Sequence, residues 1–330
     1  MLQAALSPLD ADEAYYWMYA HQLDWGYFDH PPAVAALIKF GMWLPGELGV
    51  RLGHVLISGL TVSVIWQILG RPKGRDMWIA ALLIAIQPML QVYGFIATPD
   101  GPLLLFTALF LWRFKVYLQS PTVQNGLWIG LIMAGSLYSK YHGLLLIIFM
   151  IIPNLGFLVR QSSAWIAVGF GVLLYLPHLY WQYVHDFPSF RYHLSGRNDP
   201  YQLKYTTEFL LNQVLIFNPF LWFFYFKSLF GKSRVQAGAS IDQRFLQSCR
   251  WLVFLTLGFF LYSTSRGGAE PQWTATIVVS LIFLVYHGLQ KNSSWRKPLL
   301  RIGYLSLVLF FLARIILVLP RQWLPFKKPF

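Results

Sequence analysis

Carboxylates and a histidine are concentrated in the first thirty residues of this chain, beside a dense set of aromatic residues. Asp12 and Glu13 precede Tyr15-Tyr16-Trp17, and a second group reads Trp25-Gly26-Tyr27-Phe28-Asp29-His30-Pro31-Pro32. In a protein only 12% charged, this concentration of acids indicates a functional site. A carboxylate that is partly buried against aromatic rings can act as a general base and deprotonate an incoming hydroxyl group.

A structural interpretation of the same residues is also open. Asp12 would then be the N-cap of a short helix, and Tyr15 and Tyr16 would anchor that helix at a membrane surface. Asp100 lies in Thr-Pro-Asp-Gly-Pro (98–102), a turn before an apolar stretch, and by itself it also fits an N-cap. Catalytic and structural roles can be divided between such neighbouring residues.

Asp29 and His30 stand before Pro31-Pro32 at an expected helix start, where an anion is favoured by the helix dipole. With a remote partner such as His185, Asp29 forms a candidate site for a divalent metal ion. Adjacent Asp and His residues are common by chance, so the pattern is weak evidence for a metal.

Later loops carry cations that could bind a phosphate or diphosphate at the membrane surface. They are Lys140, His142, Arg191, Arg197 and Arg266. For any single one, extension of the side chain from a helix end towards lipid headgroups explains it equally well. Together they favour an anionic lipid ligand. Arg51 is expected to pair with Glu47, four residues earlier on one helix.

The composition indicates what kind of elements must position these residues. The chain is 56% hydrophobic, and its apolar runs approach the roughly 20 residues that a membrane-spanning helix needs. The sequence therefore predicts an all-α polytopic membrane protein. The net charge of +13 fits Lys and Arg in cytoplasmic loops near anionic lipids, rather than a nucleic-acid surface.

About ten transmembrane helices are expected. Their approximate ranges are 47–69, 76–97, 103–118, 126–138, 142–159, 164–184, 209–230, 251–264, 273–289 and 302–319. Ser139-Lys140-Tyr141 should break two short helices apart. Residues 1–46 are expected to form an outer loop with short interfacial helices, including 33–44, and residues 320–330 a tail. The chain 1–330 is thus predicted to be a single transmembrane domain without a soluble C-terminal domain.

Alternating these spans across the bilayer separates two kinds of loop. Loops on one side carry most of the Lys and Arg, as cytoplasmic loops do. Loops on the other side carry every candidate named above, together with Glu270. Acids, bases and histidines on one face predict an active site at the outer membrane–water boundary.

Five motifs occur in a familiar order. They are Asp-Glu-Ala-Tyr-Tyr-Trp (12–17), the 25–32 group, Thr-Pro-Asp (98–100), Ser-Lys-Tyr (139–141) and Glu-Pro-Gln-Trp-Thr-Ala (270–275). This order resembles bacterial members of the dolichyl-phosphate-mannose-protein mannosyltransferase-like superfamily, which covers glycosyltransferase families 39 and 83 and includes aminoarabinose transferase. The resemblance covers most of the chain, and its first motif is the specific part.

The resemblance implies a GT-C membrane fold and inverting transfer of a sugar from a polyprenyl-phosphate donor at the outer face of the membrane. Asp12 matches the first-loop aspartate thought to act on the acceptor, and Asp100 the second-loop aspartate. Asp29-His30 stands where aminoarabinose transferase has a Glu-Lys pair that serves metal and donor phosphate. Relatives carry a transmembrane helix before the first loop, so either the start is truncated or the loop is translocated with the next helix.

The resulting hypothesis is a glycosyltransferase of the bacterial inner membrane that faces the periplasm and uses an undecaprenyl-phosphate-linked sugar. The acceptor would be a lipid, glycan or protein of the cell envelope. Asp12 is the proposed base, supported by Glu13 and Asp100. The remaining roles are donor phosphate contacts (His30, Lys140, Arg191, Arg197 and Arg266) and substrate contacts (Tyr15, Tyr16, His142 and Glu270).

Two rival functions stay open at this point. A transporter or flippase of lipid-linked sugars would show internal repeats and ionisable groups near mid-bilayer. Here the ionisable groups collect at one edge and no repeat is visible, although Arg314 could line a cavity. The other rival is an inactive assembly subunit.

Overall fold

The computed structural model describes residues 1–195, 199–231 and 241–318, and all regular structure in this part of the chain is helical. The N-terminal segment, expected to form an outer loop, contains α1 (Leu2–Leu6), α2 (Ala11–His21) and α3 (Ala33–Gly41). The next helices are α4 (Gly46–Ile68), α5 (Gly74–Ala85), α6 (Pro88–Val92), α7 (Asp100–Gln119), α8 (Val123–Ser139), α9 (Gly143–Ile151) and α10 (Leu155–Leu158). The remainder are α11 (Ser162–Val184), α12 (Pro188–Ser195), α13 (Leu203–Ile216), α14 (Trp222–Phe230), α15 (Ile241–Ser263), α16 (Ile277–Lys291) and α17 (Arg296–Val318).

The protein is an integral membrane protein with the all-α architecture expected from its sequence. Within the described residues, five helical segments are long and apolar enough to cross a bilayer, namely 46–68, 100–119, 162–184, 243–266 and 293–316. The pair α13 and α14, bent by 83° at a short break, would make a sixth, and shorter apolar helices cover 143–158 and 277–291. The predicted count of about ten is therefore not confirmed by helix length.

One predicted span is divided in the structure. The apolar run 76–97 forms α5 and α6, separated at Ile86 and Gln87. Pro88 explains this division, because proline has no N–H to donate and disfavours helical backbone in the residue before it. In contrast, the predicted break at 139–141 is confirmed, since α8 ends at Ser139 and α9 begins at Gly143.

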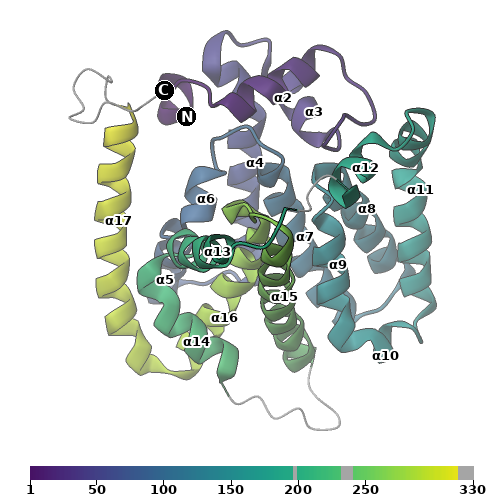
Figure 1. Ribbon diagram of the computed structural model, residues 1–330. Helices are drawn as coiled ribbons and strands as arrows, with labels where there is room; N and C mark the ends of the chain where they lie inside the picture. The colour runs from purple at the N-terminus through teal and green to yellow at the C-terminus, as the bar shows by residue number, and fades with distance from the viewer. Residues whose placement is uncertain (196–198, 232–240, 319–330) are drawn as a thin grey trace.

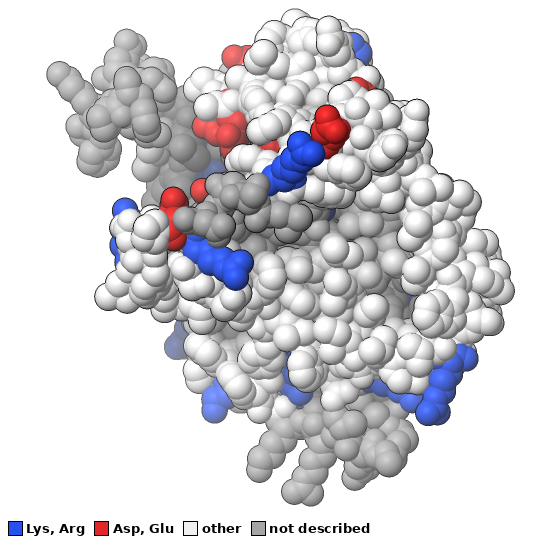
Figure 2. Space-filling view, turned by 45° about the vertical axis from the view of Figure 1, so that its right-hand side comes forward, with Lys and Arg blue, Asp and Glu red and all other residues white. Residues whose placement is uncertain are grey.

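The N-terminal segment and the charge distribution mark one end of the molecule. In Figure 1, α2, α3 and α12 lie together at the top, whereas α10 and α14 lie at the bottom. On the face shown in Figure 2, the visible Asp and Glu atoms lie in the upper half together with some Lys and Arg, whereas the charged atoms visible along the lower rim are Lys and Arg. This asymmetry agrees with the separation of loops expected from the sequence. The predicted division into 1–46, 47–319 and 320–330 stays a prediction, and its last part lies outside the described residues.

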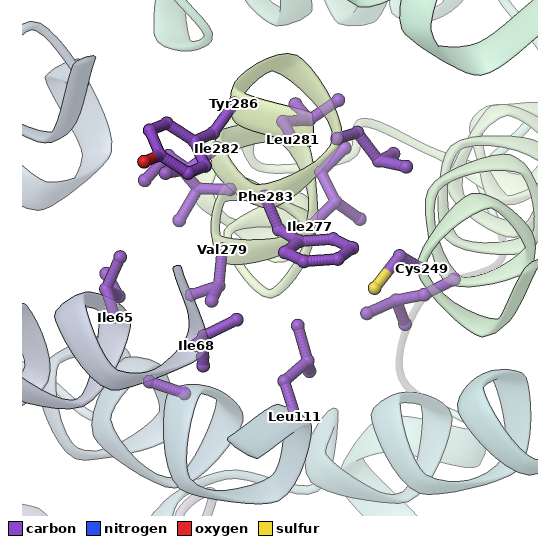
Figure 3. Close-up of a cluster of buried hydrophobic side chains, with 14 of the residues drawn as sticks. Ile65, Ile68, Leu111, Cys249, Ile277, Val279, Leu281, Ile282, Phe283 and Tyr286 are labelled. Atoms are coloured by element: carbon purple, nitrogen blue, oxygen red, sulfur yellow. The ribbon is translucent and has the colours of Figure 1, made fainter. Parts of the chain in front are cut away.

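The core is built around α16, which is buried along most of its length. Ile277, Val279 and Ile282 belong to one continuous cluster of buried side chains that also contains Ile65 and Ile68 of α4 (Figure 3). Because lipid tails are as apolar as these side chains, the stability of such a core comes from close packing more than from exclusion of water.

A seam of small residues brings α8 and α11 into backbone contact. A Cβ atom added to Gly126 would lie 2.4 Å from the carbonyl oxygen of Ser163, and one added to Gly130 would lie 2.5 Å from that of Ala167. These residues recur every four positions along each helix, as in other membrane helix pairs that approach closely. The seam holds α11 beside α8, and so fixes both helices near the 139–142 break.

Candidate active site

Asp100 and Lys140 form a nearly buried ion pair at the end of the bundle where α2 and α3 lie. Lys140 Nζ donates to both carboxylate oxygens, at 2.9 and 2.8 Å, and the two residues are only 7% and 3% exposed. Asp100 is the first residue of α7, with Pro99 at the N-cap, so its role there is this ion pair rather than the predicted cap. The break after Ser139 places Lys140 outside both helices and lets its side chain reach α7.

Carboxylates of the first and second loops act electrostatically on the Tyr16 hydroxyl. Burial raises the pKa of Tyr16 above its ordinary value, and the nearby charges of Asp12, Asp29 and Asp100 raise it further. The acids of the first and second loops, some 70 to 90 positions apart in sequence, therefore share one environment. Asp12 itself is exposed, which leaves it accessible to a substrate.

A second tyrosine, Tyr93, adds the loop that carries Glu270 to this environment. Burial raises its pKa, followed by the charges of Asp100, Asp12 and Glu270. Glu270 is exposed and stands just before the short helix Pro271–Thr274. Asp12, Asp100 and Glu270, from three segments distant in the chain, thus all influence one hydroxyl.

Glu13 is held by a buried ion pair instead of facing a substrate. Its Oε1 accepts from Arg51 Nε at 2.7 Å and from the Ala97 amide at 2.8 Å, and its Oε2 accepts from the Asp10 amide at 3.0 Å. Burial alone would raise the pKa of Glu13, but the bonds from Arg51 and the two amides outweigh burial and lower it. The side chain is fully buried, so the structure shows it bound to Arg51 and to two amides, and its predicted support of Asp12 stays a prediction.

Arg51 is the partner of Glu13 in this buried ion pair, and its predicted pairing with Glu47 is wrong. Its guanidinium also bonds Glu13 through Nη2 and donates to the carbonyl oxygens of Ala4 (3.0 Å), Ser7 (2.8 Å) and Pro8 (2.9 Å). Buried charges require such complete pairing. Arg51 does not pair with Glu47 because its side chain faces the interior of the protein and is only 1% exposed.

Glu13 also explains why α2 begins at Ala11. Asp10 is the N-cap, and its amide bonds the Glu13 side chain in a reciprocal capping box. The predicted N-cap, Asp12, lies in the first turn instead. Because Glu13 adjoins Asp12 and binds Ala97, three residues before Asp100, this ion pair fixes the two candidate acids relative to each other.

Asp29 is surrounded by groups that stabilise its charge. The hydroxyls of Tyr15 and Tyr19 lie 3.1 and 3.0 Å from its Oδ1, and Nδ1 of His30 lies 3.0 Å from the same atom. Burial opposes ionisation, but His30 and the two hydroxyls lower the pKa of Asp29 below its ordinary value. Sequence reasoning missed Tyr19, although its position four residues after Tyr15 places both on one face of α2.

The predicted metal site at Asp29 and His185 stays a prediction. Within the described residues, no group of three or more His, Cys, Asp or Glu side chains is arranged to hold a metal ion. His185 stacks on Trp181, and its Nδ1 lies 2.8 Å from the Trp181 carbonyl oxygen. Asp29 and His185 therefore offer at most two donors.

The remaining predicted contacts are dispersed over the same end of the bundle. Arg191 is exposed on α12, and the His193 ring of that helix lies 3.0 Å from the Asp29 carbonyl oxygen. Arg266 is exposed and lies over the Tyr262 ring, while His142 packs between the rings of Phe260 and Trp273. Arg197 lies outside the described residues.

Arg314, considered above as a residue that could line a cavity, instead joins two elements. Its Nη2 donates to the carbonyl oxygen and side-chain oxygen of Gln91, at 3.1 and 2.6 Å. These bonds tie α17 to the end of α6 at the edge of the bundle.

Comparisons with known proteins agree with this architecture. Residues 29–181 match the family described as dolichyl-phosphate-mannose-protein mannosyltransferase. The lipid A galacturonosyltransferase RgtD of Rhizobium johnstonii is 28% identical over 342 residues, which cover 96% of this chain and 68% of RgtD.

Two crystal structures of ArnT from Cupriavidus metallidurans have the same fold. The apo structure matches with a TM-score of 0.70 and 18% identity, covering 90% of this chain and 59% of ArnT. The structure bound to undecaprenyl phosphate matches with a TM-score of 0.71 and 19% identity, covering 98% and 64%. The chain thus spans about three-fifths of the solved ArnT structures.

Proposed function

We propose that this chain, a GT-C membrane glycosyltransferase of the ArnT type by fold and by sequence similarity, transfers a sugar from a polyprenyl-phosphate donor to a lipid of the cell envelope. The donor lipid would be undecaprenyl phosphate, as in the solved relative, and the acceptor a lipid, as for the galacturonosyltransferase. Glycan or protein acceptors are less favoured because the similar proteins named above point to lipids. The site would face the periplasm from the inner membrane.

The observation that carries this proposal is the convergence of Asp12, Asp100 and Lys140 at one end of the bundle. An inverting transfer needs one base on the side of the sugar opposite the leaving group. Asp12 is the exposed carboxylate of the group and takes this role. As the acceptor oxygen attacks the anomeric carbon, its proton passes to Asp12, and the bond to the phosphate oxygen breaks with its electrons retained by the lipid phosphate.

The leaving phosphate requires cations rather than a proton donor. Lys140 has three N–H donors and uses two on Asp100, so its third can reach a phosphate oxygen without breaking the ion pair. His30 would contact the phosphate from the first loop. Arg191 and Arg266 would contact it from the later loops at the same end of the bundle. Tyr15, Tyr16, His142 and Glu270 would contact the substrates. Arg197 keeps its predicted phosphate role, although no geometry supports it.

A divalent metal ion at Asp29 and His185 stays a prediction. The chemistry fits in part, because Asp29 is kept ionised and His185 directs one ring nitrogen at a carbonyl, as metal-binding histidines do. The ion would supply positive charge beside the donor phosphate. Since the described residues add no third donor, no step is derived through it. Transfer that is unaffected by EDTA would exclude this part of the proposal.

Transfer by the purified protein in detergent tests the function and separates it from transport. Detergent leaves no sealed compartment, so a transporter would have nothing to move between. Protein incubated with polyprenyl-phosphate sugars and envelope lipids should yield lipids whose mass is increased by one sugar. The proposal would be wrong if sugars crossed the bilayer of sealed vesicles while no glycosylated lipid formed under any condition.

A further inference from the structure

A chain of hydrogen bonds joins the first loop to the break between α8 and α9. Tyr141, which follows Lys140, has its hydroxyl 3.1 Å from Nε2 of His178 and 3.0 Å from the side-chain nitrogen of Gln182. Both partners belong to α11. The other ring nitrogen of His178 lies 2.6 Å from the carbonyl oxygen of Trp25. None of these residues belongs to the acid and cation cluster described above.

The same chain continues to a second point of the first loop. The Gln182 nitrogen lies 2.7 Å from Ser189 Oγ, and that hydroxyl donates to the Tyr27 carbonyl oxygen at 2.8 Å. His178, Gln182 and Ser189 are fully buried. Together with the bond from His193 to Asp29, α11 and α12 hold the carbonyls of three alternate residues, 25, 27 and 29.

The chemistry of the groups allows one consistent proton arrangement along this chain. A carbonyl only accepts, so His178 Nδ1 carries the proton and its Nε2 accepts from the Tyr141 hydroxyl. The Tyr141 oxygen then accepts one N–H of Gln182, and the other N–H goes to Ser189. The Gln182 nitrogen also lies 3.3 Å from His178 Nε2, so the three α11 and α12 side chains contact one another as well as the loops. These bonds define the position of Tyr141 relative to Trp25 and Tyr27.

We propose that Tyr141, His178 and Gln182 are positioning residues that set the distance between the Asp29–His30 pair and the Lys140–Asp100 pair. Tyr141 adjoins Lys140, and the held carbonyls end at Asp29, so one rigid link connects the two halves of the phosphate pocket. The link preforms the pocket before the donor arrives, which favours binding because less ordering is needed. The inference rests on the proposed function for the identity of the donor.

Tyr141→Phe tests the link because it removes one hydroxyl and keeps the ring. Tyr138→Phe is the matched control, since the Tyr138 hydroxyl also bonds α11, at the Leu174 carbonyl (2.9 Å), outside the chain. Two quantities are measured on the purified full chain in detergent. They are hydrogen–deuterium exchange in peptides covering residues 22–31, and the Kd for undecaprenyl phosphate.

Tyr141→Phe should speed exchange in these peptides at least about threefold and weaken undecaprenyl phosphate binding about tenfold, because a misplaced pocket loses its preorganisation. Tyr138→Phe should change both by less than about twofold, with a similar melting temperature. This comparison separates positioning from a general loss of stability. If Tyr141→Phe fails to fold, Ser189→Ala interrupts the same chain and should give the same pattern.

Equal exchange in the Tyr141 and Tyr138 variants would overturn the link. Faster exchange with an unchanged Kd would overturn the positioning role while leaving the proposed function intact. A wild-type protein that transfers no sugar and does not bind undecaprenyl phosphate would contradict the proposed function, and the positioning role would fall with it.

Discussion

The residues of this site are of two kinds. Some are exposed to a substrate, and others are buried and hold the exposed residues in place. Asp12 and Glu13 are adjacent, yet one is exposed and the other is fully buried against Arg51. Their spacing on α2 explains the difference, because successive helical residues point in different directions. The motif therefore combines a candidate base with the residue that fixes its position.

Replacement of Glu13 tests this division. Glu13→Gln leaves the buried Arg51 guanidinium without its counter-charge, and breaking such a pair costs about 3–5 kcal/mol. The melting temperature of the purified protein should fall clearly. Glu47→Gln, at the position first expected to pair with Arg51, should leave it unchanged, and equal losses in both variants would contradict the assignment.

The Glu13 pair also predicts a pH dependence. Its pKa is lowered in the folded state from the usual 4.5, so its stabilisation is complete above that value and is lost as pH falls through the lowered one. Thermal unfolding followed from pH 7 to pH 3 should show this acid loss in the wild type. A similar loss in Glu13→Gln would assign it to other carboxylates.

Lys140 provides the residue-scale test of phosphate binding. Lys140→Gln removes a charge-assisted bond worth about 1.5–3 kcal/mol, so the Kd for undecaprenyl phosphate should rise about 10- to 100-fold. Lys39→Gln, an exposed lysine on α3, is the control. An unchanged Kd in Lys140→Gln would remove Lys140 from the donor site.

At the scale of elements, the contact between α8 and α11 supports the site from below. The seam leaves no space for a side chain at Gly130, whereas a Cβ atom at Gly169 on α11 would meet nothing within 4 Å. Gly130→Ala should therefore lower the melting temperature, by an overpacking cost of about 1–3 kcal/mol. Gly169→Ala serves as the control, and no difference between the two would contradict the packing.

How far the sequence predicts these elements depends on how local their signals are. The break at 139–141 and the short helix α3 have local signals, and both were predicted, whereas the interfacial position of α3 stays a prediction. The division of α5 from α6 also has a local signal, Pro88. The single span 76–97 was predicted because the apolar run was followed and the proline was not taken into account. The Glu13–Arg51 pair has no local signal, since its partners are 38 residues apart. Glu47, four residues before Arg51, was the more obvious partner in the sequence.

For the candidate site, the sequence predicted which charged groups share a face, but not the uncharged residues around them. The charged groups could be assigned to one face because membrane topology sorts loops by side. Tyr93 and His178 were missed, because a tyrosine and a histidine in apolar segments look like ordinary packing until tertiary contacts show their partners. Tyr141 was named only as part of the Ser-Lys-Tyr motif, and its bonds to α11 depend on tertiary contacts.

At the scale of the whole molecule, the account requires that the acidic end faces away from the cytoplasm. The only cysteine, Cys249, is buried, so introduced cysteines can be labelled with little background. In intact cells with a permeable outer membrane, a membrane-impermeant maleimide should label Asp24→Cys and should reach Arg75→Cys only after the inner membrane is opened. The reverse pattern would place the site in the cytoplasm.

The most direct measurement is sugar transfer by purified wild type and Asp12→Asn, with Asp24→Asn as a control for an exposed acid of the same loop. Loss of the base should reduce the rate about 10²- to 10⁴-fold while undecaprenyl phosphate binding and folding persist. Asp24→Asn should keep the wild-type rate. Wild-type transfer by Asp12→Asn would contradict the central claim that the first-loop carboxylate performs the chemistry.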